Sequence, residues 1–248
     1  MSLFVFSVTI TLNDKVTGVP IMGYKVVLLD FDDTLVDFHD AEVQAYAYLM
    51  DRYKVPFHKR DYETFKKINQ AHWEAFQRGE ITKRDVLSHR FIETFKHYGM
   101  DIDGHQADVT FRDGLATAPI KWLEGVEVAL DYLKSKYSLA IVTNGVTDTQ
   151  KRRIAQTDLM SYIKHLFVSD EMGAQKPSQH FFNIVYKTMP EFQKQDFVII
   201  GDSLTSDIQG GINGGIDTIW YNHRDVENNT PITPTYTLKT MNEIHHIL

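Results

Sequence analysis

The stretch VVLLDFDDTLVD, residues 26–37, places three aspartates directly behind four apolar residues. The apolar part is short and rich in β-branched side chains, which is typical of a strand buried inside a parallel sheet. Acidic residues disfavour strands, and like charges at this spacing repel one another. The placement of Asp30, Asp32 and Asp33 at the end of such a strand therefore needs a reason, and the rest of the sequence supplies one.

Length and composition predict an ordinary globular chain. The protein has 248 residues, of which 43% are hydrophobic and 24% charged, enough for one large domain or two smaller ones, each with its own core. The net charge of −7 argues against a nucleic acid polymer as partner. If the substrate is an anion, local positive charge must offset the acidic protein around it.

The absence of cysteine and the hydropathy of the chain exclude several further classes of protein. The chain contains no cysteine, which excludes disulfides, thiolate zinc sites and cysteine nucleophiles, and which fits a cytoplasmic location. No stretch approaches the ~20 apolar residues needed to span a membrane, so no membrane partner is expected. Residues 1–21 lack a basic signal region; they are either an added leader before a start at Met22 or an extra edge strand.

Apolar runs alternate with helical patterns over most of the chain. This alternation predicts an α/β fold with a parallel sheet, in which ligands bind at the carboxyl ends of the strands. The predicted strands are 26–29, 138–143, 165–168, 197–201 and 218–221, and the predicted helices between them are 125–136, 147–158, 178–188 and 204–214. The tail after these elements predicts a loop, a short strand and a closing helix.

One segment contains no strand candidate. Residues 38–116 show only amphipathic helical runs, punctuated by glycines, so the sequence predicts an all-helical insertion directly after the first strand. The expected domains are therefore a core made of residues 1–37 and 117–248, and a helical domain of residues 38–116. The four helices predicted in it are 40–53, 60–77, 83–98 and 104–116.

Polar residues follow the predicted strands at one edge of the sheet. Crowded carboxylates raise one another's pKa unless a cation is present, and an all-oxygen ligand set favours Mg²⁺ where phosphate is handled. A lysine and a threonine hydroxyl at the same edge can bind phosphoryl oxygens. The residues concerned are Asp30, Asp32, Thr143, Asn144, Lys176, Asp202 and Asp207.

This set predicts phosphoryl transfer through a covalent intermediate. A carboxylate can act as nucleophile and split a difficult hydrolysis into two easier steps through an aspartyl phosphate. A second carboxyl group can protonate the leaving alkoxide and later deprotonate water. Asp30 is expected to attack, Asp32 to transfer the proton, and Asp33 to occupy the following turn.

Four motifs in this order resemble those of the haloacid dehalogenase (HAD) superfamily: DFDDT at 30–34, IVTNG at 141–145, AQKP at 174–177 and GDSLTSD at 201–207. The resemblance covers residues 24–248 and implies a Rossmann-like core with helices on both faces and a small helical cap that closes over the site. It also implies roles. Thr143 and Lys176 would bind phosphate, and Mg²⁺ would be held by Asp30, Asp202, the Asp32 carbonyl and, directly or through water, Asp207.

A narrower resemblance, carried mostly by WEAFQRGEITKRDVLSHRF at 73–91, is to the bacterial pyrimidine 5′-nucleotidases, which act on nucleotides such as dUMP, dTMP and UMP. Phe38 and His39, just after the first strand, and Trp73 and Arg78 are the candidate specificity residues. Helical spacing favours a core position for Trp73 over contact with a base, and a surface position is the simpler explanation of Arg78.

Several alternatives remain open at this point. The nearest is a phosphatase for another small metabolite, such as a sugar phosphate or phosphoglycolate. A dehalogenase would not need Asp32, since no leaving-group proton is required, and a phosphomutase would release little phosphate. A binding module without activity would be expected to lack a catalytic residue, and all are present. The oligomeric state is not defined by the sequence, because no exposed apolar stripe stands out.

Overall fold

The computed structural model describes residues 23–248, and its centre is a six-stranded parallel sheet. Residues 1–22, including the segment considered as an extra strand, lie outside the described part. The strand order is β3-β2-β1-β4-β5-β6, and all five pairings are parallel. The strands are β1 (Val26–Leu29), β2 (Ser138–Thr143), β3 (His165–Val168), β4 (Phe197–Gly201), β5 (Asp217–Tyr221) and β6 (Tyr236–Leu238).

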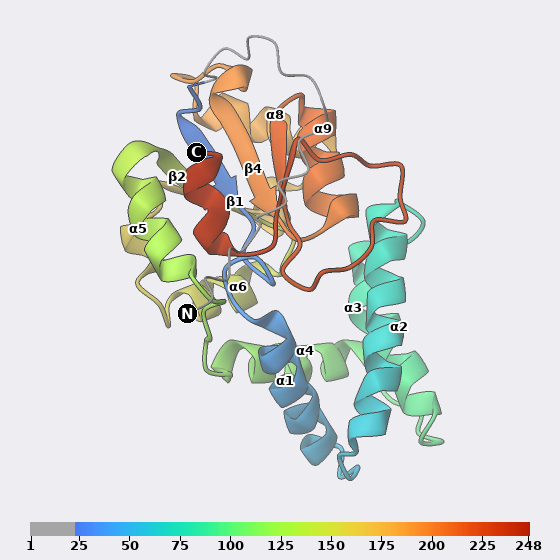
Figure 1. Cartoon of the computed structure of the whole chain (residues 1–248). Helices are drawn as coiled ribbons and strands as arrows, with labels where there is room; N and C mark the ends of the chain where they lie inside the picture. Colours follow the sequence, from blue (N-terminus) through green and yellow to red (C-terminus); the bar gives the residue numbers. More distant parts are fainter. Residues whose placement is uncertain (1–22) are drawn as a thin grey trace, which may run out of the picture.

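Helices cover both faces of this sheet, which confirms the predicted α/β class (Figure 1). Alternate residues of β1 point to opposite faces: Val27 and Leu29 pack with the helix of Val126–Lys136, while Val26 and Leu28 pack with the helix of Gln179–Thr188. The helices of the core are α5 (Val126–Lys136), α6 (Thr147–Ile154), α7 (Ser169–Met172), α8 (Gln179–Thr188) and α9 (Gln209–Gly214), with short helices η1 (Leu159–Ser161), η2 (Lys194–Asp196) and η4 (Met241–His246).

Two predicted helices differ from those observed. The helix expected over 147–158 ends at Ile154, because the amides of Gln156 and Thr157 bond to carbonyls three residues back. The helix expected over 204–214 starts as a π-helical turn, η3 (Leu204–Ile208), before α9. Such turns are frequent at functional sites, and this one carries Asp207.

The segment between β1 and α5 forms a unit of four helices: α1 (Phe38–Arg52), α2 (Lys59–Gln77), α3 (Lys83–Lys96) and α4 (Gly104–Thr117). Its own apolar cluster is built around aromatic rings, among them Tyr46, Phe65 and Phe91. Local sequence sets several helix starts: Asp37 caps α1, Asp103 caps α4, and Thr82 forms a capping box with Asp85 at α3.

The four-helix unit lies at the end of the sheet toward which the strands point (Figure 1). The carboxyl edge of the sheet, where the predicted site residues follow the strands, therefore faces these helices. None of the helices in residues 23–248 is long and apolar enough to cross a membrane.

Candidate active site

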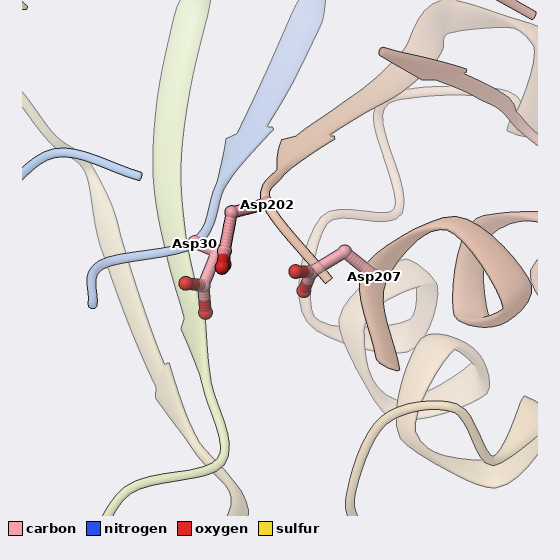
Figure 2. A group of neighbouring side chains, drawn as sticks. All are labelled: Asp30, Asp202 and Asp207. Atoms are coloured by element: carbon pink, nitrogen blue, oxygen red, sulfur yellow. The ribbon is translucent and has the colours of Figure 1, made fainter. Parts of the chain in front are cut away.

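Three carboxyl groups converge at the carboxyl edge of the sheet. Asp30 follows β1, Asp202 follows β4, and Asp207 comes from η3; Figure 2 shows their carboxyl groups turned toward one another. One oxygen from each lies within 4.8 Å of the others. The close approach of Asp207 requires the glycine at the end of β4, because a Cβ on Gly201 would lie 2.2 Å from the carboxyl carbon of Asp207.

Lys176 supplies the positive charge of this cluster. Its side chain is buried, and its ammonium donates to Asp30 Oδ1 and to Asp207 Oδ1, each at 2.6 Å, and to the carbonyl of Val142 at 2.7 Å. Burial alone would lower the pKa of Lys176, but the two carboxylates outweigh it and raise the pKa. The lysine that the sequence predicted at this edge therefore contacts two of the three clustered aspartates.

One lysine does not balance three carboxylates. Burial, followed by the charge of Asp207, raises the pKa of Asp30 to about 7 although Lys176 opposes the shift. Burial and the charges of Asp207 and Asp30 raise the pKa of Asp202 well above its usual range. A group of oxygen ligands whose negative charge is only partly balanced by one lysine fits a hard divalent cation such as Mg²⁺.

The loop after β2 is the second part of the site. The Thr143 hydroxyl is buried and accepts hydrogen bonds from the amide of Gly145 and from Gln150 Nε2. Asn144 uses both ends of its side-chain amide on the backbone of Lys176: Nδ2 donates to the carbonyl at 2.8 Å, and Oδ1 accepts from the amide at 2.9 Å. The Asn144 side chain thus ties the two loops together, and its contact with phosphate remains a prediction.

Asp32 lies apart from the three clustered carboxyl groups. Its Oδ1 accepts from Arg153 Nη1, and its Oδ2 accepts from Gln150 Nε2 at 2.8 Å. Sequence reasoning missed both partners on α6. The only available signal was their spacing of three residues, which places them on one face of a helix that begins just after the loop carrying Thr143.

Asp33 occupies the turn, as predicted, and does so in the left-handed region with φ 57°. Its Oδ1 accepts from the amide of Phe38 and from Arg224 Nη2. Aspartate tolerates this conformation better than most residues. The carboxyl group of Asp33 therefore stabilises the connection from the core into α1 and does not join the clustered carboxyl groups.

A cavity of about 220 Å³ opens above these groups. The core contributes the aspartates, Thr143, Lys176 and Arg153 to its lining, and the four-helix unit contributes mainly aromatic, amide and guanidinium side chains. The latter are Phe38, Asn69, Trp73, Gln77, Arg90, Phe111, Arg112 and Leu115.

The four candidate specificity residues divide into two pairs. Phe38 and Trp73 line the cavity. The structure does not bring His39 and Arg78 to it: His39 Nδ1 pairs with the Tyr62 hydroxyl at 3.0 Å, and Arg78 is exposed and paired with Glu80 at 2.7 Å. His39 lies in the first turn of α1 and Arg78 follows the last residue of α2, and neither is among the residues that line the cavity.

The comparisons with known proteins agree with this architecture. The family model of haloacid dehalogenase-like hydrolases matches residues 27–221. HAD-hydrolase YfnB of Bacillus subtilis is 38% identical, with the match covering 91% of this chain and 95% of YfnB. The crystal structure of YfnB, bound to magnesium and showing interdomain movement, superposes with a TM-score of 0.86 over 91% of this chain and 98% of that one.

Two further relatives carry a stated activity. The pyrimidine 5′-nucleotidase PynA of Streptococcus pneumoniae is 37% identical over 87% of this chain and 91% of its own length. The pyrimidine 5′-nucleotidase YjjG of Escherichia coli is 27% identical over 92% of this chain and 99% of its own length. The chain belongs to the haloacid dehalogenase-like hydrolases. It is a hydrolytic enzyme that resembles the pyrimidine 5′-nucleotidase branch of that family.

Proposed function

We propose that this enzyme is a Mg²⁺-dependent phosphomonoesterase that removes the 5′-phosphate from pyrimidine nucleoside monophosphates such as dUMP, dTMP and UMP. The observation that carries the proposal is the convergence of Asp30, Asp202, Asp207 and Lys176 beneath a cavity that also contains aromatic rings. The similarity to two pyrimidine 5′-nucleotidases supports the substrate class.

In this proposal Asp30 is the nucleophile. One of its oxygens attacks phosphorus, the bond from phosphorus to the 5′-oxygen breaks, and an aspartyl phosphate forms. Asp32 gives a proton to the leaving 5′-oxygen and then takes one from the water that attacks the aspartyl phosphate. Inorganic phosphate leaves, and Asp30 and Asp32 return to their starting states.

The remaining core residues hold the phosphoryl group and the metal. Lys176 and Thr143 would donate to phosphoryl oxygens, together with backbone amides of the loop around Asn144. Mg²⁺ would be held by Asp30, Asp202, Asp207 and the carbonyl of Asp32, and when bound it would neutralise charge on the transferred phosphoryl group.

Residues 38–116 are proposed to act as a cap domain over the core formed by the rest of the chain. Phe38 and Trp73 line the cavity on the cap side and are half-buried, so their rings are available to contact a nucleobase. Closure of the cap would shield the site from bulk water and leave only the water that attacks the aspartyl phosphate. A cytoplasmic location, where nucleotides are abundant, belongs to the same proposal.

The first experiment is Mg²⁺-dependent phosphate release from dUMP, dTMP, UMP, CMP, AMP, sugar phosphates and phosphoglycolate. A preference for uracil and thymine nucleotides is the expected result. A profile that favours sugar phosphates would retain the phosphatase core and reject the nucleotidase proposal. No release from any compound would reject both.

The covalent step has its own test. Asp30→Asn removes the nucleophile and is expected to lower kcat by at least ~10³-fold, because the hydrolysis then lacks its first step. The matched control is Asp33→Asn, which changes an aspartate of the same turn outside the proposed chemistry. Undiminished activity in Asp30→Asn would exclude the aspartyl phosphate.

A further inference from the structure

Both carboxylate oxygens of Asp32 are bound by side chains from one face of α6. Arg153 Nη1 contacts Oδ1, and Gln150 Nε2 contacts Oδ2 at 2.8 Å. Gln150 in turn contacts Arg153 Nη1 through its own Oε1, at 3.2 Å. The two donors therefore form a single clamp, and it fixes the plane of the Asp32 carboxylate.

Arg153 is itself rigidly held. Only 1% of its surface is exposed, although it carries a charge. Its guanidinium carbon lies 5.1 Å from the ring centre of Phe31 and 5.4 Å from that of Phe38. Phe31 precedes Asp32 and Phe38 begins α1, so the guanidinium is packed against rings on both sides of the turn that carries Asp32.

Asp32 is the only ionic partner of Arg153 among residues 23–248. A buried guanidinium without a carboxylate is strongly destabilising, so the position of each group depends on the other. The neighbouring Arg152 differs from Arg153 in exposure and in partners: it is more exposed and pairs with Asp113 and Asp148 at the surface. Burial and orientation, and not the mere presence of arginine on α6, distinguish Arg153.

We propose that Arg153, supported by Gln150, is a positioning residue that holds Asp32 in the orientation in which it exchanges protons with the leaving group and with water. This inference rests on the proposed function, because it assigns no separate chemistry to Arg153. A misplaced general acid or base of this kind typically costs about 10²-fold in rate. Replacing Arg153 is therefore expected to lower the rate only by displacing Asp32.

A double-mutant cycle tests this dependence. Arg153→Met is expected to lower kcat for dUMP by about 30- to 100-fold with KM changed by less than about threefold. In the Asp32→Asn background the same substitution is expected to change kcat by less than about twofold. If the kcat of the double variant were lowered by the product of the two single-variant losses, the proposal would be overturned. That result would show that Arg153 acts on the substrate by itself, for example through its Nε and Nη2 atoms, which have no hydrogen-bond partner within residues 23–248.

The leaving group provides a second readout. p-Nitrophenol leaves without a proton, so Arg153→Met is expected to reduce phosphorylation of the enzyme by p-nitrophenyl phosphate much less than by dUMP. The same difference between the two substrates is expected for Asp32→Asn. Arg153→Lys, which retains the charge but not the planar donor group, is expected to recover part of the lost rate. Arg152→Met is the matched control and is expected to remain within about twofold of the native enzyme. Equal losses on both substrates would contradict the proposal.

A structural readout separates this inference from the proposed function. In the crystal structure of Arg153→Met, the Asp32 carboxylate is expected to leave its present rotamer, while the three clustered aspartates stay in place. An unmoved Asp32 would overturn the positioning role, whether or not the enzyme hydrolyses nucleotides. A native enzyme inactive on the whole substrate panel would reject the proposed function, and the crystal structure would still decide the role of Arg153 in orienting Asp32.

Discussion

At the scale of single residues, the site is defined by an imbalance of charge. Asp30, Asp202 and Asp207 face one another, and Lys176 neutralises only part of their charge. The result is a raised pKa at Asp30 and at Asp202, caused first by burial and then by the neighbouring carboxylates. The chain retains a strained electrostatic arrangement that a cation would relieve.

This imbalance predicts a pH dependence of stability. A carboxyl group whose pKa is raised by folding binds more protons in the folded than in the unfolded state, so it lowers the free energy of unfolding as pH rises. For Asp30 this loss of stability is expected between about pH 4, the pKa of an unfolded aspartate, and about pH 7, the pKa in the folded state. Mg²⁺ needs the ionised groups, so it is expected to raise Tm more at about pH 8 than at about pH 5.5.

Thermal unfolding with and without Mg²⁺ at the two pH values measures this effect. Asp202→Asn removes one ligand and one charge, and it is expected to reduce the Mg²⁺-dependent increase in Tm. An Mg²⁺-dependent increase in Tm of the same size at both pH values would contradict the proposed dependence of Mg²⁺ binding on the ionised carboxylates.

A second prediction at this scale concerns Trp73. The side chain comes from α2, lines the cavity and packs edge-on against Phe76, with 5.9 Å between the ring centres. Trp73→Ala is expected to raise KM for dUMP by about tenfold, because base stacking on an aromatic ring contributes roughly 1–3 kcal/mol. Activity on p-nitrophenyl phosphate should change little, and an unchanged KM for dUMP would remove Trp73 from the base-binding residues.

At the scale of elements, a chain of buried polar contacts joins the four helices of the proposed cap. Arg90 on α3 donates to Asp108 on α4 at 2.6 Å and to Asn69 on α2 at 2.7 Å. Asn69 donates to Glu42 on α1 at 2.6 Å. Burial lowers the pKa of Arg90 and raises that of Glu42, and the partners in this chain of contacts oppose both shifts.

Asp108 is expected to be critical for the stability of these helices. It is fully buried and accepts from both Arg90 and Arg112, at 2.6 and 2.7 Å. Asp108→Asn leaves two arginines without their carboxylate and is expected to lower the free energy of unfolding by about 3–5 kcal/mol. Urea denaturation followed by circular dichroism measures the loss.

The matched control is Asp113→Asn on the same helix. Asp113 is largely exposed and pairs with Arg152 at the surface, so its replacement should have a small effect. Equal losses for the two variants would show that the buried network contributes no more than a surface pair.

At the scale of the whole molecule, Lys83 links the helical unit to the core. It sits at the start of α3, and its ammonium donates to the carbonyls of Asn144 and Gly145 and to Ser169 Oγ, and it pairs with Asp170 at 2.5 Å. Burial lowers its pKa although Asp170 opposes the shift. The contact joins the proposed cap to the loop that is expected to bind phosphate.

Lys83→Met is expected to lower kcat/KM for dUMP by about tenfold, because closure over the substrate would lose its main polar contact with that loop. The comparison variant is Lys121→Met, because Lys121 is more exposed than Lys83 and pairs with Asp40 of α1 and not with the loop after β2. Steady-state kinetics with dUMP measure kcat/KM for both variants, and only Lys83→Met is expected to lower it. Equal rates in the native enzyme and in Lys83→Met would show that this contact does not contribute to closure.

Much of this architecture was predictable from local sequence. Apolar runs of four to six residues mark the strands, and the parallel order makes the ends of β1, β2 and β4 meet at one edge. The motif aspartates and Lys176 were therefore expected close together, and three of the carboxyl groups do converge. Asp33 was likewise expected in a turn, and its positive φ agrees with this.

The sequence by itself thus determined the fold class and the carboxylates at the sheet edge, because burial periodicity and strand direction are local properties. Only the tertiary structure decided which distant side chains meet. Arg153 and Asp32 are 121 residues apart, and Lys83 and Gly145 are 62 apart. Such contacts depend on how each helix is rotated about its axis and on where α3 and α6 lie relative to the loops at the carboxyl edge of the sheet. The same physical reason placed Trp73 in the cavity and left Arg78 at the surface.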